Sequence, residues 1–182
     1  MNYKEYGTMS AVQKTILDEV QKNSGLAIHT NNFMKFKAEC GPIAHQADGC
    51  YARTQPWYSP IEEEMLFWNI PFADERAMSV LFHELGHATG HKTRLDRMLD
   101  NNDQKALCME ESIAEYTAVA LMKYFGFETA HTYNWSMKYI NMCNKVLTDA
   151  AQAYAKAESS KAIVYILDNW LADFNKSQKK AV

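Results

Sequence analysis

Apolar and polar residues alternate differently in the two halves of this chain of 182 residues. In the first half, apolar positions recur at helical spacing after Ser10, a residue suited to cap a helix start, and this period stops at Gly25. Residues 26–60 are mixed and contain Gly-Pro, Asp-Gly and Ser-Pro dipeptides, which are typical of turns between short strands. The best strand candidates are residues 50–53 and 65–68. The apolar run of the second fits either an edge strand or an interior strand.

From Phe72 onward the chain has the 3.6-residue period of helices. This period predicts four helices, over about residues 74–89, 104–126, 131–157 and 159–174, with a frayed end from residue 176. Gly126 lies where a helix C-terminus favours a residue in the left-handed conformation. Because strands come first and helices afterwards, the sequence predicts an α+β domain in which a small sheet precedes the helices.

Composition limits the fold class and the partners. The length favours one domain, and no repeat, low-complexity tract or linker divides the chain. The formal net charge of -3 gives no overall attraction to nucleic acid. The chain has no apolar run long enough for a membrane span, and its first residues lack the apolar stretch of a signal peptide. We therefore expect a cytoplasmic location, no membrane partner, and reduced thiols at Cys40, Cys50, Cys108 and Cys143.

One motif carries recognisable chemistry, the HExxH sequence His83-Glu84-Leu85-Gly86-His87. On a helix, two histidines four residues apart share one face and can reach the same metal ion. Glu84 is rotated by about 100° from His83, so its carboxylate stands beside the metal rather than on it. Zinc lowers the pKa of a bound water to about 7, and a carboxylate alongside can take its proton and pass it to a leaving amine.

The same motif also fits two satisfied histidines on a helix face with a surface glutamate. Residues 78–82, which precede it, are apolar and compatible with a helix, so they place the motif on a buried helix. This context favours the metal interpretation, with one zinc ion per chain.

A catalytic zinc site needs a third protein ligand. His91 lies eight residues after His83, about 12 Å along a continuous helix, and Gly90 interrupts the helix between them. His91 is therefore a poor third ligand. The longer histidine pattern of metzincins would place its third ligand at residue 93, which is Thr93, so that class is discounted.

The segment EESIAE, residues 110–115, is the second source of a third ligand. Glu111 and Glu115 are four residues apart and share a helix face, so one can bind zinc while the other orients a ligand histidine. Glu110 points about 100° away and fits a solvated helix start. This pattern favours Glu111 as the ligand over Glu110 or Glu115.

The stretch LFHELGHATGHKTRLDR, followed by EESIAEYTAVALMKYFG, resembles the zincin-like metallopeptidase domain of plasmid antirestriction proteins and of phage and mobile-element polyvalent proteins. The likeness extends over roughly residues 50–172 and is specific around residues 81–116. The second stretch is also similar to the glutamate helix of gluzincins. The resemblance implies a zinc site with His83, His87 and Glu111 as ligands, Glu84 as general base and Glu115 as the carboxylate that supports a histidine.

The resemblance also implies a domain organisation and an activity. We expect a single zincin-like domain over residues 1–182, with an N-terminal helix and irregular segment at 1–49 and a metallopeptidase core at 50–175. The core would be a small sheet followed by an active-site helix, a glutamate helix and C-terminal helices. The expected activity is zinc-dependent hydrolysis of a protein or peptide substrate in the service of a phage or mobile element. The alternative is a non-catalytic zincin-fold module that blocks a host partner such as a restriction system.

Antirestriction proteins of this type carry a larger N-terminal domain that binds single-stranded DNA. Here about 50 residues precede the matching region, and they show no basic stripe with interleaved aromatic residues. We therefore do not expect this chain alone to bind nucleic acid.

Several further polar residues are weaker candidates. Substrate contact or support of the site is expected from His91, Arg94 and Tyr116, although His91 equally fits a local hydrogen bond in a turn. Arg94 and Arg97 fit either a substrate carboxylate or ion pairs with acidic residues such as Asp96, Asp100 or Asp103. Candidates to stabilise a tetrahedral oxyanion are Tyr51, Tyr116, His131 and Tyr133, each of which also fits a packing role.

Overall fold

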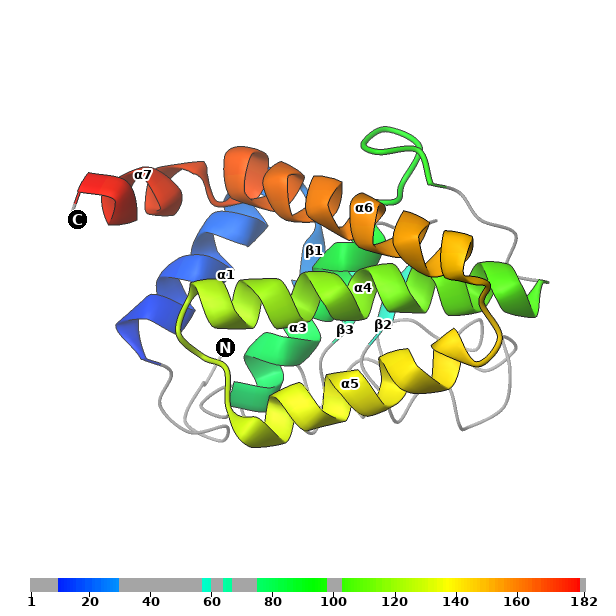
Figure 1. The fold of residues 1–182 in the computed structure, drawn as a ribbon. Coiled ribbons are helices and arrows are strands. Elements are labelled where there is room, and N and C mark those ends of the chain that lie inside the picture. The colour runs from blue at the N-terminus through cyan, green and yellow to red at the C-terminus, as the bar shows by residue number, and fades with distance from the viewer. Residues whose placement is uncertain (1–9, 30–56, 60–63, 67–74, 98–102, 181–182) are drawn as a thin grey trace, which may run out of the picture.

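The computed structural model describes residues 10–29, 57–59, 64–66, 75–97 and 103–180, which are mostly helical (Figure 1). In chain order the elements are α1 (Ala11–Ser24), β1 (Ala27–His29), β2 (Trp57–Ser59), β3 (Glu64–Leu66), α3 (Glu75–Ala88), α4 (Gln104–Tyr124), α5 (Ala130–Asn144), α6 (Asp149–Tyr165), the π-helix η3 (Ile166–Trp170) and α7 (Ala172–Lys180).

The three described strands have three residues each and pair in the order β1-β3-β2. β1 runs parallel to β3, whereas β2 runs antiparallel to it. The part of the expected strand 65–68 that lies in β3 is therefore interior among these strands. The expected strand at residues 50–53 lies outside the described residues. Strands this short do not by themselves establish the predicted small sheet.

The first helix begins and ends where the sequence predicts. α1 starts at a capping box, in which Ser10 Oγ accepts from the Gln13 N–H and the Gln13 side chain accepts from the Ser10 N–H. It ends at Gly25, whose φ of 71° lies in the left-handed region. The buried Ile16 and Leu17 belong to the main core, so α1 packs its apolar face against the rest of the molecule.

The core is centred on α3 and α4. In Figure 1, α4 runs across the molecule between α5 and α6, and α3 lies behind it. The apolar face of α3 is wholly buried, since Phe82 and Leu85 have no exposed surface and share one cluster with Ala118 and Leu121 of α4. Full burial of a large apolar side chain stabilises a fold by about 1.5–3 kcal/mol. Apolar packing therefore stabilises the contact between these two helices.

The C-terminal helices differ from the prediction. The expected helix over residues 131–157 is two helices, α5 and α6, separated by residues 145–148. Thr148 caps α6 by accepting from the Ala151 N–H, and Asp149 lies in the first turn, where a carboxylate is favourable. These start signals were missed because helical periodicity continues on both sides of them.

The expected helix boundary at residues 157–159 is also wrong. The hydroxyls of Ser159 and Ser160 donate to the Lys156 carbonyl within α6, at 2.8 and 3.1 Å, so they do not cap a new helix. The chain then passes through η3 into α7, which extends to Lys180. The segment from residue 176 to that point is thus helical rather than frayed.

The structure also bears on the cysteines and on the membrane. Cys108 and Cys143 are free thiols, as expected, whereas Cys40 and Cys50 lie outside the described residues. In the part of the chain that the structure describes, no helix is both long enough and apolar enough to cross a membrane.

Candidate metal centre

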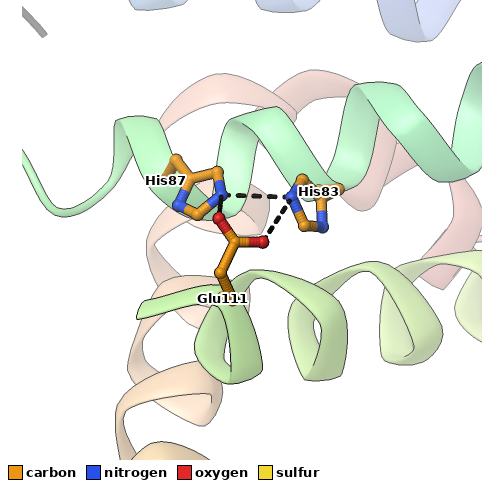
Figure 2. A group of neighbouring side chains, drawn as sticks. All are labelled: His83, His87 and Glu111. Carbon is orange, nitrogen blue, oxygen red and sulfur yellow. Dashed lines mark hydrogen bonds and ion pairs between the residues drawn. The ribbon is translucent and has the colours of Figure 1, made fainter. Parts of the chain in front are cut away.

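His83 and His87 project from the same face of α3, one turn apart (Figure 2). Phe82 and Leu85 turn the other face into the core, so the imidazoles face α4, each with 18% of its side chain exposed. Their Nε2 atoms are 3.1 Å apart and the rings meet edge-on. Two neutral imidazoles can share at most one hydrogen bond across this gap. The lone pairs of the two Nε2 atoms therefore point toward the same position.

Glu111 of α4 completes the group. Its Oε2 lies 3.6 Å from His83 Nε2, and its Oε1 lies 3.6 Å from His87 Nε2 (Figure 2). Ligand atoms held at about 2.0–2.1 Å around a tetrahedral ion are about 3.3–3.4 Å from one another. The three side chains, which alone among the described residues form such a group, thus fit a single divalent ion.

A close approach of α3 and α4 brings Glu111 within reach of the histidines. A Cβ atom added at Gly86 would lie 2.8 Å from the Cα atom of Ala114, which is closer than two carbon atoms can pack. Ala114 lies one turn after Glu111 and directly before Glu115. The glycine of the HELGH motif therefore sets the spacing between the helix that carries the histidines and the helix that carries the glutamates.

Glu115 lies behind His83, with its Oε1 3.3 Å from His83 Nδ1. The pair has the spacing of an ion pair, although the ring N–H is not aligned with the carboxylate as in a good hydrogen bond. Burial raises the pKa of Glu115, but the interactions with His83 and a hydrogen bond from Ser136 outweigh it and hold the pKa below its usual range. Glu115 is thus an anionic partner for the ring nitrogen of His83 that faces away from the metal position.

Glu110 takes the equivalent place behind His87. Its Oε1 lies 3.4 Å from His87 Nδ1 and 3.0 Å from Nη2 of Arg97. Burial raises the pKa of Glu110, but hydrogen bonds from His87 and Arg97 outweigh this and lower it. The expectation of a solvated Glu110 is therefore wrong. Arg97 does form an ion pair, with Glu110, whereas the suggested partner Asp100 lies outside the described residues.

The surrounding carboxylates make the site attractive to positive charge. Burial is the largest influence on the pKa of His83 and lowers it, but the close contact with Glu115 and the charges of the nearby glutamates raise the pKa to about 9. The pKa of His87 is raised in the same way, with Glu110 the largest contributor against burial. A divalent ion would supply the positive charge that this group of carboxylates favours.

The sequence model of a family described as zincin-like metallopeptidase matches residues 44–160, which is more than half of the chain. The chain belongs to this family. The match includes the two histidines of α3 and all three glutamates near the start of α4. Among curated proteins, none matches the chain.

Two solved structures of the antirestriction protein ArdC from the R388 plasmid share the fold. The Mn(II)-bound structure matches with a TM-score of 0.58 and 20% identity over 89% of this chain. The metal-free structure matches with a TM-score of 0.57 and 18% identity over 91% of this chain. The matched part is 53% and 52% of those chains, so this chain spans about half the length of ArdC. The likeness shows that the chain shares the fold of these structures, and the family match describes that fold as zincin-like.

Glu84, the expected general base, follows His83 directly in α3. It is 5% exposed, and its charge contributes to the raised pKa of both His83 and His87. The charge of Glu84 therefore acts on both imidazoles.

Two site residues of this zincin-like chain were missed in the sequence. Tyr139 of α5 is half-buried, and burial followed by the charge and hydrogen bonding of Glu111 raises the pKa of its hydroxyl. Ser136, one turn earlier, interacts with Glu115. A signal was present, because the spacing of Ser136 and Tyr139 puts both on one helix face, as the spacing of Glu111 and Glu115 does on α4.

The remaining candidates do not belong to the group of three ligand side chains. His91 Nδ1 is 2.8 Å from Thr93 Oγ1, which fits the local turn contact considered for it. Arg94 donates to the Ala88 carbonyl at 2.9 Å, and its guanidinium lies 5.4 Å from the ring centroid of Trp170. The aromatic and histidine candidates are dispersed: Tyr116 lies under Lys156 of α6, His131 and Tyr133 are exposed on α5, and Tyr51 is outside the described residues.

Proposed function

We propose that this chain is a zinc-dependent peptidase in which His83, His87 and Glu111 hold the metal and Glu84 is the general base. The observation that carries the proposal is the convergence of His83, His87 and Glu111, which each offer one ligand atom within 4.8 Å of the others, in a member of a metallopeptidase family. Two imidazoles and one carboxylate are a ligand set that catalytic zinc sites use.

We assign a separate role in the reaction to each residue of the site. A bound zinc ion supplies Lewis-acid chemistry, which polarises a carbonyl and acidifies water. Glu84 accepts the proton of the attacking water and returns it to the leaving amine. Glu115 and Glu110 hold the Nδ1 sides of the two histidines, which leaves both Nε2 atoms for the metal. Tyr139 contacts the ligand Glu111 from α5.

The proposed metal is zinc, one ion per chain. Imidazole suits several divalent metals, and a ligand set by itself does not select one of them. The ArdC structure contains Mn(II), so manganese is the comparison metal of choice. Metal analysis after reconstitution with equal concentrations of both ions would show which one the chain retains, and no bound metal in either case would contradict the site.

The decisive experiment compares wild type with Glu84→Gln. The amide keeps the size of the side chain but accepts no proton at neutral pH. We expect Glu84→Gln to retain its metal and to lose at least about 100-fold in peptide cleavage. Glu128→Gln is the matched control, because Glu128 is exposed between α4 and α5. Equal cleavage by wild type and Glu84→Gln would reject the mechanism.

A second candidate function is a non-catalytic module that blocks a host partner. The likeness to an antirestriction protein favours it, since the shared fold covers most of this chain. In this case Glu84→Gln with its metal retained would keep full biological activity in a restriction assay. Service to a phage or mobile element, a cytoplasmic setting and the single domain 1–182 are part of the proposal in both forms.

A further inference from the structure

Arg97 and Glu110 form an ion pair next to the metal centre. The Arg97 side chain is 2% exposed and that of Glu110 is 16% exposed. Nη2 of Arg97 donates to Glu110 Oε1 at 3.0 Å, and Nε donates to Oε2 at 3.3 Å. The guanidinium therefore forms hydrogen bonds with both carboxylate oxygens. Such two-point contact fixes the plane of the carboxylate as well as its position.

Fold stability alone does not account for this pair. Removing two charges from water costs several kcal/mol per ion, and apolar replacements of a buried pair are often as stable or more stable. A surface ion pair, such as Lys176 with Asp173 on α7, carries no comparable cost because both side chains are exposed. The pair is better explained by the position and orientation that it gives to the Glu110 carboxylate.

Glu110 connects the arginine to the metal centre. Its Oε1 accepts from Arg97 and also faces His87 Nδ1 at 3.4 Å, which is long for a hydrogen bond but within the range of an ion pair. An imidazole with its proton on Nδ1, facing this carboxylate, keeps the lone pair on Nε2. That lone pair is the one directed at the metal position shared with His83 and Glu111.

The other donors of Arg97 bind the last turn of α3. Nη2 donates to the Gly86 carbonyl at 2.8 Å, and Nη1 donates to Thr89 Oγ1 at 3.0 Å. These acceptors lie one residue before and two residues after His87. The guanidinium therefore joins the backbone that carries His87 to the carboxylate of α4 that faces its ring.

The loop after α3 is shaped to return Arg97 to this position. The Leu95 N–H donates to the Thr89 carbonyl and the Arg97 N–H donates to the Gly90 carbonyl, at 3.0 and 2.9 Å. Asp96 has a φ of 50°, a left-handed conformation that reverses the chain directly before Arg97. A Cβ at Gly90 would lie 3.2 Å from Arg97 Nη2 and 3.3 Å from Glu110 Oε1. Gly90 thus leaves room for the ion pair.

From this geometry we propose that Arg97 is a positioning residue of the metal centre, which acts through Glu110 to fix the orientation of His87. The inference rests on the metal site of the proposed function, and it assigns a purpose to the TGHKTRLDR segment that follows the HExxH motif. Arg97 touches neither metal nor substrate in this role.

The test measures metal affinity by chelator competition, with Zn²⁺ and with Co²⁺, in wild type, Arg97→Met, Arg97→Lys and Glu110→Gln. Loss of an outer partner of a ligand histidine weakens metal binding by about 10- to 100-fold, and we expect this range for Arg97→Met and Glu110→Gln. Lysine carries a positive charge but lacks the planar guanidinium that binds both carboxylate oxygens. Arg97→Lys should therefore keep more of the wild-type metal affinity than Arg97→Met, but not all of it. The visible spectrum of bound Co²⁺ should change in each variant, because it reports the ligand geometry.

A double variant distinguishes positioning from general damage. Because Arg97 acts through Glu110, adding Arg97→Met to Glu110→Gln should change the affinity by no more than about twofold, whereas independent effects would multiply. The exposed Lys176→Met is the control for loss of an ion pair and should bind metal as wild type does. All affinities are measured well below the melting temperature of the metal-free variants.

Wild-type affinity and an unchanged Co²⁺ spectrum in Arg97→Met would overturn the inference and leave the proposed function intact. If Arg97→Met does not fold, Glu110→Gln and Arg97→Lys decide by the same criterion. Wild type that binds neither metal would instead reject the proposed site itself.

Discussion

Gly86→Ala is the most direct test of the helix spacing at the metal centre. The added Cβ would lie 2.8 Å from Ala114 Cα and 3.3 Å from Ala114 Cβ. Carbon atoms in contact prefer about 3.5–4.0 Å, so α3 and α4 must separate locally by roughly 0.7 Å or more. The closest atom belongs to the backbone, which cannot rotate aside as a flexible side chain can.

Two opposed contributions set the stability of this variant. Alanine in place of glycine in a helix stabilises by about 0.8–1 kcal/mol, whereas overpacking a tight contact costs about 1–3 kcal/mol. The metal-free variant should therefore be less stable by about 0–2 kcal/mol. The effect on metal binding should be larger, because ligand distances tolerate only about 0.2 Å and Glu111 moves with α4. We expect at least a 10-fold weaker affinity.

The assay combines urea unfolding of the metal-free protein with chelator competition. Adding Ala114→Gly to Gly86→Ala should restore little, because Ala114 Cα remains the nearest atom. A variant that gains stability and binds metal like wild type would show that the two helices are not in the close contact described.

Three further predictions concern the ligands, the pH dependence and nucleic acid. Glu111→Ala should abolish tight metal binding while Glu115→Ala weakens it by about 10- to 100-fold, and equal losses in equilibrium dialysis would contradict the assigned roles. In chelator-treated protein, the pKa of His83 is raised from 6.5 to about 9, so its contribution to stability is fully present below pH 6.5 and is lost as the pH rises through about 9. This contribution amounts to at most about 3 kcal/mol, and it should vanish in urea unfolding of His83→Ala. With a net charge of -3, the chain should bind single-stranded DNA weakly at physiological salt, and a tight, salt-sensitive complex in a titration would refute this.

The structure brings together the side chains that the sequence predicts as ligands, because their placement depends mostly on local geometry. His83 and His87 share a face through helix geometry alone, and the apolar residues around them determine which way the opposite face turns. Spacing within one helix puts Glu111 and Glu115 on one face and only favours Glu111 as the ligand, and the structure brings Glu111 to the two histidines.

The supporting contacts were not predictable from spacing along one element. Glu110 faces away from Glu111 on its helix, and it reaches His87 only because α4 crosses α3 where Gly86 leaves no side chain. Arg97 reaches Glu110 because the chain reverses direction at Asp96. The sequence carries no signal for this reversal, since a left-handed residue other than glycine is uncommon. The division between α5 and α6 was missed for a different reason, because Thr148 and Asp149 interrupt no apolar period.

The packing of α3 against α4 has a consequence for the order in which the protein is assembled. The apolar contacts among Phe82, Leu85, Ala118 and Leu121 include no metal ligand, and the ligands stand on the two helices that these contacts join. In small metal-dependent domains, by contrast, the chain remains unfolded until the ion arrives. Here the ion would enter a site that helix packing has already formed, and it would exchange with the medium without unfolding of the chain. The availability of metal in the cell would then control how many molecules carry the ion and not how many are folded.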